Sequence, residues 1–218
     1  MTTPATLSSE ILEAPEIRPR GSLLISETAR RLLDEGVRQL IRQGYHGSGL
    51  KGLLASVGVP KGSFYHYFDS KDAFAGAVVR HYMAPFLDRL QQLNQESRWT
   101  GADLLRRYFE DLIQESRRLG FRDGCLLGNL MGEAGACTGP CTEMALREAL
   151  EQYVDALATL IGRAQHDGSL SARTEARDLA EQLIDQWQGA LLRAKFERTE
   201  RPLRQCLQGL LGTELSPS

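Results

Sequence analysis

The sequence has no apolar run long enough to cross a membrane, since none approaches the ~18 residues that a spanning helix needs. Its first twenty residues also lack the basic start and apolar stretch of a secretory signal. Cysteine is scarce, and four thiols in 218 residues do not look like a disulfide framework. These absences argue against a membrane protein and a secreted domain, so we expect the chain in the cytoplasm with its thiols reduced.

Recognisable catalytic and cofactor sites are also missing. There is no glycine-rich nucleotide loop and no Ser-His-Asp arrangement with supporting context. Cys137 and Cys141 have the spacing of a metal pair, but the Gly-Pro pair between them breaks the helix that would align them. We therefore expect no enzyme, no cofactor and no metal. Cys137 or Cys141 could instead be an oxidation partner for Cys125, and Cys206 could pack in an interface.

Alternating strand patterns are absent, whereas helical periodicity runs along most of the chain. Apolar residues recur at three- and four-residue steps in about nine segments, which predicts an all-α fold. Residues 1–22 show no period and should form a mobile tail. Residues 23–69 read as three helices, the first of which should stop at Gly44. Residues 70–218 form a larger helical body, and Pro85 should bend or split its first helix.

Charge is balanced over the whole chain but not along it. The 26 basic and 28 acidic side chains give a formal net charge of −2. Residues 17–72, however, hold nine Lys or Arg against five Asp or Glu, a local charge of +4. A basic segment joined to an acidic remainder fits a DNA-binding head on a body with another role.

The segment Val59–Phe68 is the densest cluster of aromatic and basic residues. Pro60 suits a helix start because its missing N–H would have no intrahelical partner there. Phe64 and Phe68 lie four residues apart on one face and can anchor the helix to a core. The remaining Lys, Ser, Tyr and His side chains then point outward, where they suit phosphates and base edges. With the short helix before it and a turn at Gly58, this segment predicts a helix-turn-helix.

The candidate DNA contacts follow from this arrangement. We expect base-edge contacts from the start of the helix, at Lys61, Gly62, Ser63 and Tyr65. We expect phosphate contacts at His66, Tyr67, Lys71 and Ser48. The alternative reading is a surface helix whose aromatic side chains only cover a core.

The helix order, the motif Lys61–Phe68 and the Ser70-Lys71 pair after it resemble the TetR family of one-component bacterial repressors. The resemblance covers roughly residues 24–75. It implies a homodimer whose two heads bind a palindromic operator in double-stranded DNA. It also implies that residues 70–218 bind a small-molecule effector, hold the dimer together and change the spacing of the heads.

Two motifs of the body, Phe121–Leu130 and Trp187–Lys195, look like one branch of that family. The branch contains the N-ethylmaleimide-responsive and the acrylate-responsive repressors. The resemblance implies that Cys125, which matches the sensor cysteine of the branch, detects the effector.

Cys125 also has a physical case as a reactive thiol. It should open a helix that runs to about Ala136, where amide groups and the helix dipole favour an anion. Basic side chains close in sequence would lower the pKa of the thiol and raise its thiolate fraction, namely those of Arg117, Arg118 and Arg122. The alternative is an inert cysteine packed as a small hydrophobe.

A pocket around this thiol would contain Asn129, Tyr108, Trp187 and Arg193, although Trp187 also lies on an apolar stripe typical of a core. The sequence therefore predicts a repressor released by an electrophile, an unsaturated acid or an oxidant acting at or near Cys125. A noncovalent ligand, with Cys125 only lining the pocket, is the alternative, and an activator or a nonspecific DNA organiser is a third. The small residues of Gln188-Gly189-Ala190, with the last helix, should form a four-helix dimer interface.

Overall fold

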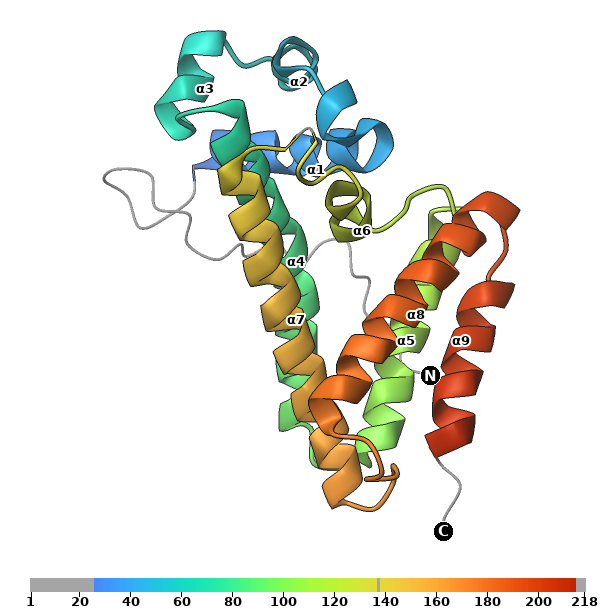
Figure 1. Ribbon diagram of the computed structural model, residues 1–218. Helices are drawn as coiled ribbons and strands as arrows, with labels where there is room; N and C mark the ends of the chain where they lie inside the picture. The colour runs from blue at the N-terminus through green and yellow to red at the C-terminus, as the bar shows by residue number, and fades with distance from the viewer. Residues whose placement is uncertain (1–25, 137, 215–218) are drawn as a thin grey trace, which may run out of the picture. The chain divides into compact units, whose positions relative to one another are not determined.

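The computed structural model describes residues 26–136 and 138–214, so the predicted tail and Cys137 lie outside the described residues. Within them the chain forms nine α-helices and no strand (Figure 1), which confirms the all-α prediction. The helices are α1 (Glu27–Gly47), α2 (Leu50–Val57), α3 (Lys61–Tyr67), α4 (Lys71–Gln95), α5 (Gly101–Arg118), α6 (Leu126–Met131), α7 (Pro140–His166), α8 (Ala176–Glu197) and α9 (Arg201–Glu214).

The chain divides into two compact units. The first contains the chain up to Pro85 together with Leu126–Ala149, and the second contains Phe86–Cys125 and the chain from Leu150 onward. The boundaries fall within α4, between Cys125 and α6, and within α7.

The first unit is built on an aromatic cluster beneath α3. Phe64 is fully buried and Phe68 is 5% exposed, which confirms the predicted anchor. The Phe64 ring lies 5.3 Å from the ring of Phe74, and the Phe68 ring lies 4.9 Å from it. Ser70 caps α4 as expected from the sequence, since its hydroxyl accepts a hydrogen bond from the Ala73 amide at 2.9 Å. The recognition-type helix is therefore held by side chains on one face only.

The turn between α2 and α3 depends on Gly58. This residue has φ 68° and ψ 33°, a left-handed conformation that glycine adopts without a steric penalty. The Val59 amide then donates to the Leu54 carbonyl at 3.0 Å, the hydrogen bond of a Schellman cap. This backbone turn, together with the Arg31 guanidinium that donates to the Val57 carbonyl at 2.8 Å, sets how α3 leaves α2.

α1 differs from the expected helix at its C-terminal end. It continues to Gly47, although Gly44 was expected to stop it. Gly44 instead makes a kink, with φ 69° and ψ −177° inside the helix. The helix resumes because hydrogen bonds from outside α1 stabilise the residues around the kink, as described below.

The second unit packs α9 against both α5 and α8 (Figure 1). Its core contains the rings of Phe109 and Trp187, whose centroids lie 4.7 Å apart. One arginine of α7 fixes the connection between α4 and α5: the Arg163 guanidinium donates to the Glu96 carbonyl at 2.6 Å and to the Trp99 carbonyl at 3.1 Å. It also donates to the carbonyls at the end of α4, those of Leu93 and Asn94.

Two other helices differ from the sequence expectations. α4 runs through Pro85 as one helix, so the proline does not split it. α6 is shorter than the expected span to Ala136, because it ends at Met131 and Gly135 then adopts φ 76° in the turn that follows.

No helix of the described chain is long and apolar enough to span a bilayer. No group of three or more His, Cys, Asp or Glu side chains in residues 26–136 and 138–214 is arranged to hold a metal ion.

Candidate DNA-binding surface and thiol site

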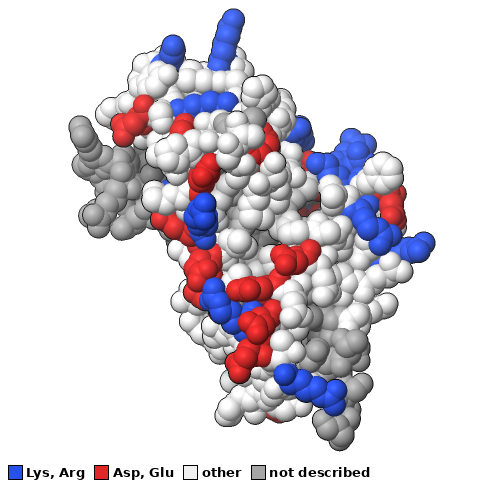
Figure 2. Space-filling model, viewed as in Figure 1, with Lys and Arg blue, Asp and Glu red and all other residues white. Residues whose placement is uncertain are grey.

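The exposed side of α3 carries the side chains that the sequence analysis assigned to DNA. Lys61 and His66 are exposed, and Tyr65 is 49% exposed. Ser63 and Tyr67 are half-buried at the edges of this surface. Lysine and arginine side chains project from the surface over α2 and α3 (Figure 2). This surface can offer cationic, hydroxyl and ring donors to phosphates and base edges.

Gly62 lies on the same exposed side of α3. A Cβ built at this position meets no atom within 4 Å. The backbone of the first turn of α3 is therefore open to close approach by another molecule.

Ser48 and Lys71 are placed differently from the expectation. The Ser48 side chain is buried and donates to the Tyr45 carbonyl at 3.0 Å. The Lys71 ammonium donates to the same carbonyl at 2.7 Å and lies 4.3 Å from the centre of the Tyr45 ring. Burial lowers the pKa of Lys71, and the charge of Glu133 opposes this effect. Both side chains are thus held within the fold, and their phosphate contacts stay a prediction.

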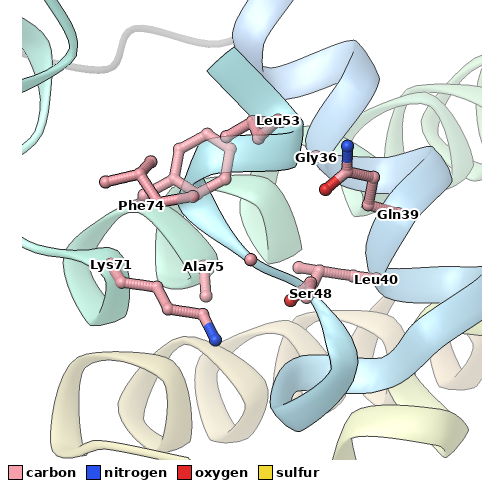
Figure 3. Close-up of a pocket in the computed structure, with 10 residues that line it drawn as sticks. Gly36, Gln39, Leu40, Ser48, Leu53, Lys71, Phe74 and Ala75 are labelled. Atoms are coloured by element: carbon pink, nitrogen blue, oxygen red, sulfur yellow. The ribbon is translucent and has the colours of Figure 1, made fainter. Parts of the chain in front are cut away.

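These two side chains also line a small, mostly apolar cavity among α1, α2 and α4. Figure 3 shows Ser48, Lys71, Gln39 and Phe74 around it. Its other lining residues are Gly36, Leu40, Gly49, Leu50, Leu53 and Ala75. The cavity lies at the point where the first turn of α2 approaches α4, so it belongs to the support of the helix-turn-helix.

Cys125 is half-buried and immediately precedes α6, rather than opening it as expected. The side-chain amide of Gln188 lies 3.2 Å from the Cys125 sulfur. Arg117 forms an ion pair with Glu200 and Arg118 with Glu115, so both have acidic partners, and their predicted effect on the thiol stays a prediction.

A buried pair of tyrosine hydroxyls lies in the same unit. Tyr108 donates to the hydroxyl of Tyr153 at 3.1 Å, and the two side chains are 1% and 8% exposed. Burial raises the pKa of Tyr153, the hydrogen bond from Tyr108 lowers it, and the negative charge of a Cys125 thiolate raises it. The thiol is therefore within electrostatic reach of this pair. The sequence analysis missed Tyr153 because it lies on an apolar stripe and reads as core.

Three further residues of the predicted pocket have other partners in the structure, and their part in an effector site stays a prediction. Trp187 is 4% exposed and packs on Phe109, so it belongs to the core. Arg193 is exposed on α8 and pairs with Glu197 at 2.9 Å. Asn129 belongs to the first unit, where its amide donates to the Ile41 carbonyl at 3.0 Å.

α8 also presents an apolar side to solvent. Leu192 is 69% exposed and Phe196 is 88% exposed. A Cβ built at Gly189, on the same helix, meets no atom within 4 Å. Large exposed apolar side chains beside a glycine suit close packing against another helix.

Family models match both parts of the chain. The model for bacterial regulatory proteins of the tetR family matches residues 32–78, and that for the tetracyclin repressor-like C-terminal domain matches residues 101–210. The chain belongs to the TetR family. It is therefore a DNA-binding helix-turn-helix regulator of this family, as the sequence resemblance implied.

Curated relatives of this TetR-family chain are transcriptional regulators. The transcriptional regulator AcuR of Cereibacter sphaeroides is 37% identical over 186 residues, covering 85% of this chain and 84% of the relative. The repressor DhaR of a Mycobacterium species is 32% identical over 82% of this chain and 87% of its own length. The repressor NemR of Escherichia coli K12 is 31% identical over 83% of this chain and 90% of its own length.

Solved structures of the family have the same fold. A regulatory protein TetR from Rhodobacter sphaeroides superposes with a TM-score of 0.80 at 34% identity, covering 87% of this chain and all of that one. The reduced form of Escherichia coli NemR superposes with a TM-score of 0.78 at 29% identity, covering 88% of this chain and all of that one.

Proposed function

We propose that this chain is a homodimeric repressor that binds a palindromic operator and releases it when a small effector acts at or near Cys125. The observation that carries the DNA-binding part is the orientation of α3, which buries Phe64 completely and leaves Lys61, Tyr65 and His66 toward solvent. In this proposal residues 23–69 are the DNA-binding domain and residues 70–218 hold the effector site and the dimer contact.

The operator assignment is tested with an inverted repeat taken from near the protein's own gene. Two recognition helices should enter successive major grooves about one turn apart, ~34 Å. We expect the purified protein to prefer this duplex over a random duplex of equal length in a gel-shift titration. A monomer in solution, or equal affinity for both duplexes, would contradict the proposal.

Dimer formation is supported by the exposed side of α8, where Leu192 and Phe196 would be removed from water by a second copy. Replacing Leu192 with Asp would place a charge in that contact. We expect this variant to be monomeric in analytical ultracentrifugation and to lose operator preference with it.

Thiol chemistry is the favoured form of effector response. The names of the relatives fix no effector, but Cys125 has an amide donor on its sulfur and a nearby tyrosine pair. In the proposed step the Cys125 thiolate adds to the C=C bond of an unsaturated carbonyl compound. A C–S bond forms, the π bond breaks, and the carbon next to the carbonyl takes a proton from solvent.

The noncovalent alternative is favoured by one observation, the buried Tyr108–Tyr153 pair, which can donate to a carboxylate or carbonyl. Cys125→Ser separates the two versions. We expect the serine variant to bind the operator with wild-type affinity and to resist release by N-ethylmaleimide. Unchanged release in the serine variant would remove the thiol mechanism and leave the noncovalent one.

A further inference from the structure

The kink of α1 at Gly44 is completed by two side chains from the segment that follows Cys125. In an uninterrupted helix the Tyr45 amide would donate to the Ile41 carbonyl four residues earlier. Here the Tyr45 amide donates to Glu133 Oε1 at 3.0 Å, and the Ile41 carbonyl accepts from the Asn129 amide at 3.0 Å. The donor and the acceptor that the kink separates are therefore both satisfied by the chain around α6.

The Glu133 carboxylate fits this position closely. Its second oxygen accepts from the His46 amide at 3.1 Å, so the two carboxylate oxygens bind two consecutive backbone amides. A Cβ on Gly44 would lie 2.1 Å from Glu133 Oε1, and the φ of 69° is one that other residues rarely adopt. Only glycine at position 44 allows both the kink and the carboxylate.

A straight form of α1 would also satisfy the groups that the kink separates. If α6 withdraws, Gly44 can return to the helical region, and the Tyr45 amide can then pair with the Ile41 carbonyl within α1. In the straight form the Tyr45 amide and the Ile41 carbonyl would pair with each other, so neither of these two groups would lack a partner. A segment whose backbone groups are hydrogen-bonded in two different conformations would switch between two states rather than deform continuously.

The kinked form has consequences for the helix-turn-helix. The Tyr45 carbonyl accepts from Lys71 at 2.7 Å and from Ser48 at 3.0 Å, and α2 begins at Leu50. Straightening α1 at Gly44 turns this carbonyl along the helix axis and away from both donors. The start of α2, and α3 after it, would then move relative to the rest of α1.

The segment that completes the kink directly follows Cys125, the proposed sensor, in the sequence. α6 packs against α1 through a face that includes the fully buried Leu126 and Leu130. Leu126 is the residue directly after Cys125, and α6 spans the six residues from there to Met131. A change in the position of Cys125 therefore acts on α6 through one peptide bond.

We propose that Asn129 and Glu133 form a clasp that holds α1 in its kinked, operator-binding form, and that withdrawal of α6 straightens α1 and releases DNA. This inference rests on the proposed function. It gives a positioning role to three residues, namely Gly44, Asn129 and Glu133.

The test uses the full-length protein and the variants Glu133→Ala, Asn129→Ala and Gly44→Ala. Glu148→Ala is the matched control, since it removes an exposed carboxylate of the same unit that pairs with Arg80 and does not contact α1. One readout is the backbone ¹³Cα and ¹⁵N chemical shifts of residues 43–47, measured without DNA or effector. The other is the affinity for the operator duplex.

We expect each clasp variant to move these shifts toward helical values and to weaken operator binding about tenfold, on the scale of one charge-assisted hydrogen bond. The double variant Gly44→Ala/Glu133→Ala should lose no more than the larger single effect, because both changes bias the same equilibrium. The Glu148→Ala control should match wild type in both readouts. If Glu133→Ala fails to fold, Asn129→Ala and Gly44→Ala carry the same test.

Alkylation of Cys125 tests whether the proposed sensor is coupled to the kink. In a variant that keeps Cys125 as its only cysteine, N-ethylmaleimide should move the shifts of residues 43–47 in the direction seen for Gly44→Ala. Unchanged shifts after complete alkylation would overturn the coupling. Wild-type shifts and affinity in all three clasp variants would overturn the clasp while leaving operator binding intact. Absence of operator preference in the wild type would instead contradict the proposed function, and the shifts would still decide the kink.

Discussion

Arg198 Nη1 donates a hydrogen bond to the Phe121 carbonyl at 2.8 Å, and both residues have a left-handed backbone. Their φ values are 55° and 53°, and within the described residues they are the two non-glycine residues with positive φ. Arg198 is the C-cap of α8, and Phe121 lies in the loop between α5 and α6 that leads to Cys125. The hydrogen bond thus joins two strained positions of the second unit.

Two substitutions at Arg198 distinguish the cost of its left-handed backbone from the loss of its hydrogen bond. Arg198→Ala removes the guanidinium and keeps a side chain in the left-handed region, whereas Arg198→Gly removes both the hydrogen bond and the steric penalty. We expect the glycine variant to be more stable than the alanine variant by about 1 kcal/mol, measured by urea unfolding. Equal stability would mean that the left-handed conformation at this position carries no strain.

α1 and α4 lie so close at Gly36 that one added methyl group should lower the stability of the protein. A Cβ at Gly36 would lie 2.6 Å from both Phe74 Cζ and Val78 Cγ2. We expect Gly36→Ala to destabilise the protein by about 1–3 kcal/mol, the usual cost of overpacking. Gly52→Ala is the control, because a Cβ there meets nothing within 4 Å, and it should stabilise α2 by about 0.5–1 kcal/mol. Both values can be read from denaturant unfolding curves.

Acid should weaken the contact between α4 and the start of α7. Burial raises the pKa of Asp72, but hydrogen bonds from Thr142 and from the Cys141 amide outweigh this, and the pKa is lowered. A carboxyl whose folded pKa lies below its unfolded value stabilises the fold above the unfolded value and loses this contribution as pH falls through the folded pKa.

We therefore expect the free energy of unfolding to fall, with a contribution from Asp72, as the pH drops below the ordinary Asp pKa of about 3.9. Asp72→Asn should be less stable than wild type at pH 7 and should show a flatter pH dependence in this range. A variant with the same slope as wild type would show that the carboxylate does not contribute to acid sensitivity.

The exposed start of α3 predicts a salt-dependent effect on DNA binding. Lys61 is exposed, and its ammonium lies 6.0 Å from the centre of the Tyr65 ring. If Lys61 neutralises a phosphate, Lys61→Ala should reduce the slope of log K against log salt by about 1 and weaken all duplexes alike. If it contacts a base edge, the loss should be confined to the operator. Arg106→Ala, an exposed cation of α5, should change neither quantity.

Local patterns in the sequence were sufficient for the helix-turn-helix. The spacing of Phe64 and Phe68 placed both in the core, and Ser70 was identified as a cap from its position alone. These features depend on contacts within a few residues or on one helical face, which periodicity reports directly. Family motifs added the fold of the body.

Long-range contacts could not be read from the sequence. The kink at Gly44 depends on Glu133, which is 88 residues away from its partner Tyr45 in the chain. Arg193 shares a helix with Trp187 but lies on the exposed side, and the Tyr153 hydroxyl accepts a hydrogen bond from Tyr108 although its spacing indicates core. In each case the sequence predicts the helix, but contacts with residues far away in the chain determine what each side of that helix does.

The Schellman cap at Gly58 makes the turn into α3 through backbone hydrogen bonds, in which the side chains of Lys61 and His66 take no part. Substitutions at these two exposed positions would therefore change the surface of α3 while leaving the turn that precedes it intact.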